Sequence, residues 1–333
     1  MICLSAGSVA LSQKQVPVTG THKADPVAVI FDTDMGPDYD DVGAMALLHA
    51  FADRGECRIL ATVASNRYPE VAGVLNVLNT YFQRPSLAIG VVRGPAVALH
   101  AWQRRDSMLV ADYPHVIRRN EEVEDAVTLY RRLLAVEPDT SVTIITVGFF
   151  TNMANLLSSG PDGLSPLTGK ELVTRKVKRL VSMAGCFDQR MGTFREFNVV
   201  KDPAASQVVF DGWPRPILFS GFEIGAEIFT GLPIVRSGVK HSPVRDVFAR
   251  CIPMDPHDAK GRMSWDETAV LVAVRGAGPY FDVISGRIVS RVDGSNGWDA
   301  AGTRDGYLVR RMPVKEVEGV IDALMMHRPK LSL

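Results

Sequence analysis

The sequence predicts an α/β protein with a Rossmann-like open central sheet, mostly parallel, and helices on both faces of that sheet. Short apolar segments alternate with amphipathic ones from Val27 onward, which is typical of βαβ units. The apolar segments are nearly continuous in hydrophobicity, as expected for strands that are covered on both sides. The chain has 333 residues, 46% of them apolar, which is enough to bury a large core.

The first two thirds of the chain alternate strand and helix regularly. The expected strands are residues 27–31, 58–64, 87–92, 142–147, 177–183 and 216–219. The expected helices between them are residues 41–54, 69–82, 124–136, 151–158 and 203–210. Pro69 suits the start of its helix, where the missing N–H costs nothing. After Gly221 the pattern is less regular; it predicts helices at 243–251, 266–275 and 314–326, and a hairpin over 281–292 with Ser285-Gly286 at its turn.

Residues 1–25 differ from the rest and read as a leader. A small apolar stretch is followed by an unpatterned polar one, which fits either a disordered leader of a cytoplasmic protein or the remnant of a secretory signal. The compartment therefore stays open. Residues 26–333 show no internal repeat and no flexible linker, so we expect one domain. The four cysteines lack CxxC spacing, which predicts ordinary thiols rather than a zinc site or disulfides.

Composition excludes two classes of partner. Lys+Arg and Asp+Glu number 37 each, so no charge excess favours nucleic acid or an anionic membrane. No apolar run approaches the roughly 20 residues that span a bilayer.

Five aspartates fall within ten residues directly after the first strand: Asp32, Asp34, Asp38, Asp40 and Asp41. Their charges repel each other and become favourable around a hard cation, and calcium tolerates the irregular oxygen geometry of a loop. One alternative is a solvated acidic loop that caps the helix at Asp41. Another is a phosphatase of the haloacid dehalogenase type, which also places an Asp-x-Asp after a strand.

Other polar residues follow later strands, where ligands of open α/β sheets bind. These are Ser65-Asn66, residues 147–152 and the loop before Asn198. With the aspartates, they resemble the inosine–uridine-preferring nucleoside hydrolase family. The matching motifs, in order, are Asp-Thr-Asp-x-Gly at 32–36, the Asp-Asp pair at 40–41, Ser65-Asn66, Gly-x-x-Thr-Asn at 148–152, Glu-Phe-Asn at 196–198 and Trp265-Asp266.

The resemblance implies hydrolysis of the N-glycosidic bond of a ribonucleoside. It assigns Asp34, Asp41, Asp266 and the Val147 carbonyl as Ca²⁺ ligands, with Asp34 also taking the proton from the attacking water. It further implies a homo-oligomer, a dimer or tetramer. The residues implied to hydrogen-bond the sugar hydroxyls, and so to favour the oxocarbenium-like transition state, are Asp40, Asn66, Glu196 and Asn198.

The chain departs from the family pattern at several positions. Two extra residues precede the Asp-Asp pair, so Asp38 could replace Asp40 or be a further ligand. Trp265 stands where one subgroup has a histidine that protonates the leaving base. Trp265 cannot act as an acid but could stack on a purine, which makes a purine nucleoside the expected substrate. Trp102 is a candidate for the second face of such a stack, and the neighbouring His100 is an alternative acid.

The family's asparagine shortly before Glu196 is also missing, and Arg190 could contact the 5′ side of the ribose instead. Two further functions stay open on the sequence: hydrolysis of another ribosyl compound, and a ribosyl- or nucleoside-binding protein without enzymatic activity.

Overall fold

We describe the protein from a computed structural model, in which residues 25–329 are described. The predicted leader lies outside these residues except for Asp25. A ten-stranded sheet runs through the molecule in the order β11-β10-β12-β7-β6-β5-β1-β2-β3-β4. Its strands are β1 Val27–Thr33, β2 Cys57–Ala64, β3 Ala88–Val91, β4 Glu124–Asp125, β5 Val142–Thr146, β6 Val177–Met183, β7 Ile217–Ser220, β10 Phe281–Ser290, β11 Asn296–Asp299 and β12 Asp305–Arg310.

The neighbouring strands from β12 to β4 are all parallel, and β10 is antiparallel to both β11 and β12. The prediction of a mostly parallel sheet is therefore confirmed. β8 (Phe229–Thr230) and β9 (Arg262–Met263) form a separate antiparallel pair.

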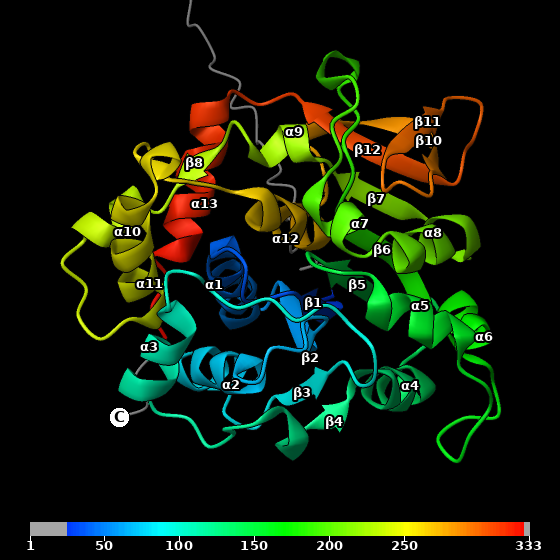
Figure 1. Ribbon diagram of the computed structural model, residues 1–333, viewed down its shortest axis with the longest axis horizontal. Helices are drawn as coiled ribbons and strands as arrows, with labels where there is room; N and C mark the ends of the chain where they lie inside the picture. Colours follow the sequence, from blue (N-terminus) through cyan, green and yellow to red (C-terminus); the bar gives the residue numbers. More distant parts are fainter. Residues whose placement is uncertain (1–24, 330–333) are drawn as a thin grey trace, which may run out of the picture.

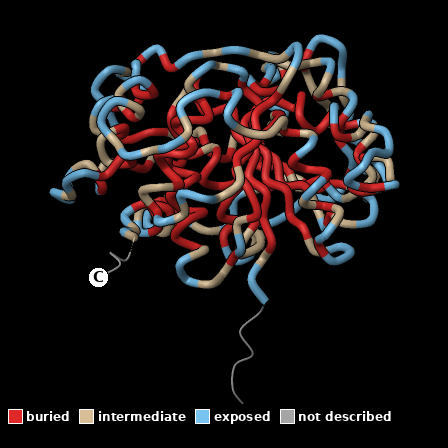
Figure 2. Tube along the Cα trace, turned by 90° about the horizontal axis from the view of Figure 1, so that it is seen from below, coloured by how far each residue is buried: buried red, intermediate tan, exposed pale blue. Residues whose placement is uncertain are grey.

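Helices cover both faces of the sheet (Figure 1). One face carries α1 Asp40–Asp53, α2 Val71–Tyr81, α11 Pro243–Cys251, α12 Trp265–Arg275 and α13 Val314–Met325, which share one apolar cluster. The other face carries α4 Ala126–Val136, α5 Thr151–Ser158, α6 Gly169–Lys176 and α8 Pro203–Gly212, which share a second. The shorter helices are α3 Arg105–Asp112, α7 Phe197–Lys201, α9 Phe222–Gly225 and α10 Leu232–Arg236. The strands between the layers are buried through the centre (Figure 2).

The direction of the chain across the sheet changes at β1. From β1 the chain continues through β2 and β3 on one side, whereas β5, β6 and β7 follow on the other. In open α/β sheets this switch point leaves a crevice beyond the carboxyl ends of the two central strands. Here those strands are β1 and β5, so the aspartate loop after β1 faces the loop that follows β5.

The predicted hairpin over residues 281–292 is wrong. β10 continues through Ser285-Gly286 and pairs with β12 over Phe281–Gly286 and with β11 over Arg287–Ser290. The turn comes after Ser290. Gly286 is required for close packing, because a Cβ there would lie 2.3 Å from Nε1 of Trp298. A glycine inside a strand often marks such a close approach.

The remaining sequence predictions about the chain as a whole have mixed outcomes. Cys57, Cys186 and Cys251 are free thiols, as predicted, and Cys3 lies outside the described residues. Within residues 25–329, no helix has the length and hydrophobicity needed to cross a bilayer. The single-domain assignment stays a prediction, although the ten-stranded sheet draws on strands from both ends of the described chain.

Candidate active site

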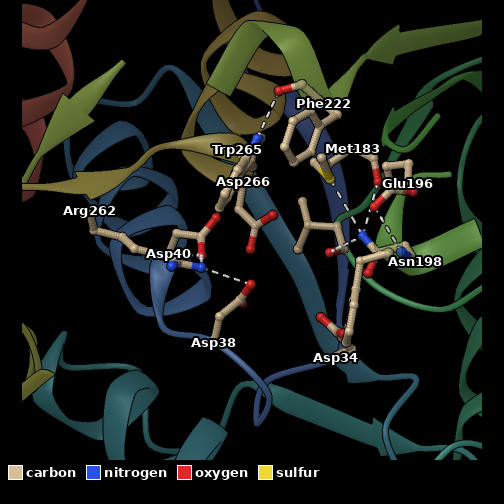
Figure 3. Close-up of a pocket in the computed structure, with 12 residues that line it drawn as sticks. Asp34, Asp38, Asp40, Met183, Glu196, Asn198, Phe222, Arg262, Trp265 and Asp266 are labelled. Carbon is tan, nitrogen blue, oxygen red and sulfur yellow. Dashed lines mark hydrogen bonds and ion pairs between the residues drawn. The ribbon is translucent and has the colours of Figure 1, made fainter. Parts of the chain in front are cut away.

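A cavity of about 300 Å³ lies beyond the carboxyl ends of β1, β5 and β6 (Figure 3). It collects residues from loops that are far apart in the sequence. Its lining consists of Asp34, Asp38, Asp40, Val147, Met183, Glu196, Phe197, Asn198, Phe222, Arg262, Trp265 and Asp266. Of the residues predicted for the site, seven are in this lining, whereas Asp41, Asn66 and Trp102 are not.

The aspartate loop is shaped by close backbone contacts. Gly36 has no room for a side chain, because a Cβ there would lie 2.4 Å from the Asn66 amide nitrogen and 2.6 Å from the Leu99 carbonyl oxygen. Thr33 accepts a hydrogen bond from the Met35 backbone N–H and donates one to Oδ1 of Asp41. The loop therefore turns Asp34 toward the cavity while Thr33 holds Asp41 behind it.

Three of the carboxyl groups repel each other in a buried space. Burial raises the pKa of Asp34, Asp41 and Asp266 well above the usual range, and the charges of neighbouring aspartates raise it further. No ion pair among the described residues neutralises any of the three. Asp41 Oδ2 is buried without a hydrogen-bond partner. A positive charge is the simplest way to stabilise these groups in their ionised form.

Asp38 and Asp40, in contrast, have a cation of the chain's own. Arg262, from β9, donates from Nη2 to Asp38 at 2.8 Å and from Nε and Nη2 to Asp40 Oδ1 at 3.1 and 3.0 Å. Arg262 was not among the residues predicted for the site. A lone arginine 222 residues away from its partner leaves no local signal.

Glu196 and Asn198 close the opposite side of the cavity. Asn198 Nδ2 donates to the Val147 carbonyl at 3.1 Å and to the Met183 carbonyl at 3.2 Å. Glu196 caps α7 by accepting from the backbone N–H groups of Asn198 and Val199 at 2.8 and 3.1 Å. Burial raises the pKa of Glu196 to about 7. Both residues thus hold the local structure and also face the cavity.

An aromatic wall lies across the cavity from Asp34 and next to Asp266 (Figure 3). Trp265 Nε1 donates to the Phe222 carbonyl at 2.8 Å, and the two rings lie 5.3 Å apart at 30°. Met183 lies beside Phe222 in this wall (Figure 3), and Phe197 also lines the cavity. Phe222, Phe197 and Met183 were not singled out as site residues from the sequence. A hydrophobic residue near a strand end looks the same whether it faces the core or a ligand.

Asn66 lies under the aspartate loop and braces it. Its amide group donates to the carbonyls of Asp34, Met35 and Leu99 at 3.0, 3.3 and 2.6 Å. Its oxygen accepts from the backbone N–H groups of Leu99 and Tyr68. The backbone therefore occupies both polar ends of this buried side chain, and contact with a sugar stays a prediction.

Three further candidates lie away from the cavity lining. Trp102 is 52% exposed in the segment before α3, and His100 is also exposed. Arg190 pairs with Asp188 at 2.6 Å and lines a separate cavity. Their predicted contacts with the base or the 5′ side of the sugar stay untested predictions.

Asp32, the first aspartate of the motif, is buried below the cavity rather than in it. Its Oδ2 accepts from the Tyr130 hydroxyl at 2.9 Å and from the Asn152 amide at 3.0 Å. Asn152 also donates to the Ala64 carbonyl at 3.0 Å. Asp32 and Asn152 therefore tie β1, β2 and α5 together under the loop, which agrees with a structural role for Asn152.

The model of the inosine-uridine preferring nucleoside hydrolase family matches residues 29–303. The chain belongs to this family. A haloacid dehalogenase-type phosphatase, the alternative suggested by the Asp-x-Asp motif, is thereby excluded.

Individual family members are distant relatives. The pyrimidine-specific ribonucleoside hydrolase RihA of Klebsiella pneumoniae is 29% identical over 213 residues, which are 57% of this chain and 59% of that protein. The chain thus matches less than two thirds of the length of this curated relative.

Solved nucleoside hydrolases share the fold. The purine-preferring ribonucleoside hydrolase from Gardnerella vaginalis superposes with a TM-score of 0.68 at 16% identity, covering 90% of this chain and 98% of that one. The type III effector protein XopQ, solved in complex with adenosine diphosphate ribose, superposes with a TM-score of 0.66 at 15% identity, covering 92% and 94%.

Nucleoside hydrolases are metal-dependent, and the donor chemistry of this cavity fits a divalent cation. Asp34, Asp41 and Asp266 offer carboxylate oxygens that form no ion pair among the described residues, although the charge of Arg105 partly lowers the pKa of Asp41. One oxygen of Asp41 lacks any hydrogen bond. Within residues 25–329, no three acidic, histidine or cysteine side chains already converge in metal-ligand geometry.

Proposed function

We propose that this protein hydrolyses the N-glycosidic bond of a ribonucleoside, with a purine nucleoside as the preferred substrate. One observation carries the proposal: the carboxylates of Asp34 and Asp266 line a cavity that also has an aromatic wall, and the carboxylate of Asp41 lies buried behind Asp34. This arrangement matches the two halves of a nucleoside, since the sugar offers hydroxyl groups and the base offers a flat apolar face. Membership of the nucleoside hydrolase family supports it.

Asp34, Asp41, Asp266 and the Val147 carbonyl would hold Ca²⁺, whose flexible coordination suits ligands from three separate loops. When bound, the cation makes a water more acidic and helps to hold the sugar. Asp34 lines the cavity, where its carboxylate can reach a water held beside the cation. In the proposal Asp34 accepts the proton of the water that attacks the anomeric carbon, as the bond to the base breaks and the base leaves with the bonding electrons.

The sugar is held on the side of Asp40, Glu196 and Asn198. Hydrogen bonds from sugar hydroxyls to these groups strengthen as positive charge develops on the ring, and therefore favour the transition state over the ground state. In our proposal Asn66 acts by keeping the backbone of the aspartate loop in place, in addition to the sugar contact implied by the family resemblance.

The base would leave along the aromatic wall. Trp265 and Phe222 offer ring faces to a purine, and stacked rings gain about 0.5–1.5 kcal/mol beyond the burial of their area. Trp265 has no proton to give at neutral pH, so the leaving base would take its proton from solvent. Trp102, half-exposed outside the cavity, would reach the base only if its segment moved inward.

Released sugar tests the proposal directly. A panel of purine and pyrimidine nucleosides is incubated with the protein, and reducing sugar is measured with and without a calcium chelator. We expect release from inosine or guanosine that stops with the chelator and returns when Ca²⁺ is added back. Absence of release from every nucleoside, despite a bound cation, would contradict hydrolysis and favour a nucleoside-binding protein.

A second candidate is binding or hydrolysis of another ribosyl compound. It is favoured by the structural likeness to XopQ, which was solved with adenosine diphosphate ribose. Calorimetric titration with adenosine diphosphate ribose and with adenosine distinguishes the two, because tighter binding of the larger compound would favour this candidate. We also propose a homodimer or homotetramer, by likeness to the family, which light scattering in solution would test.

A further inference from the structure

Arg262 is the one residue of the cavity lining that carries a positive charge, and the function proposed above does not use it. It lies in β9, three residues before α12, and only 8% of it is exposed. Burial alone would lower the pKa of its guanidinium, but the carboxylates of Asp40, Asp38 and Asp258 raise it. Arg262 is therefore a permanent cation inside the site.

The guanidinium is fixed on all sides. Its central carbon lies 5.0 Å from the ring centres of both Tyr39 and Trp265. Nη1 faces Asp258 at 3.7 Å, and Asp258 in turn accepts a hydrogen bond from the Tyr39 hydroxyl at 2.5 Å. A group held by two rings and a third carboxylate has little freedom to rotate, so it can impose a position on whatever else it binds.

Arg262 binds Asp38 and Asp40, two aspartates of the loop that follows β1. Nη2 bridges them, at 2.8 Å from Asp38 Oδ2 and 3.0 Å from Asp40 Oδ1. The bridge uses one oxygen of each carboxylate. The second oxygen of Asp40 meets only the distant Asp266 backbone N–H at 3.4 Å. Each carboxylate thus keeps an oxygen that can accept a hydrogen bond from another donor.

Figure 3 shows Asp38 and Asp40 on the same side of the cavity, with the guanidinium of Arg262 between them. Two carboxylates side by side in a partly dry cavity repel each other and lose hydration. The bridge offsets both costs, because it brings a positive charge to each group and satisfies one oxygen of each. Without it, Asp38 is free to turn to solvent, since 39% of its side chain is already exposed.

We propose that Arg262 is a positioning residue that holds Asp38 and Asp40 as a pair of acceptors for the hydroxyl groups of the substrate's sugar. The inference rests on the proposed function and gives Asp38 a place in it: Asp38 accompanies Asp40 rather than replacing it. Arg262 does not serve as a receptor for a substrate phosphate, because its Nε and Nη2 are engaged by carboxylates that would repel an anion.

The test combines variants of Arg262 with substrates that lack one sugar hydroxyl. Values of kcat/KM are measured for a ribonucleoside and for its 2′-deoxy and 3′-deoxy forms. We expect Arg262→Gln to lose about 10- to 100-fold on the ribonucleoside, the range expected for hydrogen bonds to charged groups. One deoxy form lacks the hydroxyl that Asp38 or Asp40 would bind. For that substrate, Arg262→Gln should lower kcat/KM by only about threefold or less. Arg262→Lys should recover part of the loss, because it keeps the charge without the fork.

Two controls separate positioning from general damage. Arg245→Gln removes an arginine that pairs with Asp246 at 2.8 Å, outside the cavity lining. It should leave kcat/KM unchanged for every substrate. Asp38→Asn should lower kcat/KM much less in the Arg262→Gln background than in the wild type, because the two residues act as a unit. Equal losses on ribo- and deoxy-substrates, or additive effects of the two substitutions, would overturn the proposal.

Binding measurements distinguish failure of this proposal from failure of the proposed function. Dissociation constants of the same nucleosides are measured by calorimetry, with unfolding temperatures to verify folding; if Arg262→Gln does not fold, Arg262→Lys is used. If the wild type binds nucleosides without releasing sugar, hydrolysis fails, but a preference for the ribo form that is lost in the variant still supports the role of Arg262. A preference that is unchanged in the variant contradicts it.

Discussion

Replacement of Asp34 by asparagine should change activity and stability in opposite directions. The substitution preserves shape and removes one charge from a cluster that includes Asp38, Asp40 and Asp41, whose charges raise the pKa of Asp34 beyond the effect of burial. At an effective dielectric constant near 20, the repulsion between two unit charges on neighbouring side chains is on the order of 2 kcal/mol. Removing one should therefore raise the free energy of unfolding of the metal-free protein by on the order of 2 kcal/mol.

Activity should fall for the same reason. If Asp34 takes the proton of the attacking water, its loss should lower kcat by about 10²- to 10⁴-fold, the usual contribution of a positioned base. Loss of a cation ligand would add to this. The unfolding experiment uses urea with a chelator present, and activity is followed by release of reducing sugar from a nucleoside.

The matched control is Asp282→Asn, which changes an exposed aspartate that pairs with Arg311 at 3.5 Å on the surface. It should leave activity unchanged and alter stability by less than about 0.5 kcal/mol. Retained turnover in Asp34→Asn would refute the proposed base. A metal-free Asp34→Asn protein less stable than the wild type would refute the reasoning from charge repulsion.

Three further predictions follow from the site. Burial raises the pKa of Glu196 from 4.5 to about 7, so the folded protein binds this proton more tightly than the unfolded chain. Its contribution to stability is therefore full below pH 4.5 and falls by about 3 kcal/mol as the pH rises to 7. Urea unfolding of the chelated protein should show stability falling over this pH range, and the fall should be smaller by about this amount in Glu196→Gln. Trp265→Ala should lower kcat/KM for purine nucleosides by about tenfold and Trp265→Phe by less; equal losses for a substrate with a small, non-aromatic leaving group would contradict stacking. Gly36→Ala should disrupt the aspartate loop, because the added Cβ meets the Leu99 carbonyl and the Asn66 amide; calorimetry should then show weaker cation binding, and unchanged affinity would contradict the packing argument.

Features set by neighbouring residues were predictable. Thr151–Ser158, Val177–Met183 and Pro243–Cys251 have the predicted bounds, because hydrophobic periodicity and local start and stop signals suffice for such elements. The hairpin predicted over residues 281–292 was wrong because Ser285-Gly286 has the residue types of a turn. In the folded protein these residues lie within β10, where the ring of Trp298 packs against Gly286.

The motif at residues 32–41 already placed a concentration of carboxylates at the end of a buried strand, and the alternation of strands and helices placed that strand in a parallel sheet. What these patterns could not determine is which carboxylates share a partner. Arg262 binds Asp38 and Asp40, whereas Asp34, Asp41 and Asp266 have no ion-pair partner among residues 25–329. Hydrophobic patterning reports the local environment of a residue, but an ion pair across more than 200 residues exists only once the chain has folded and brought both charges into one cavity.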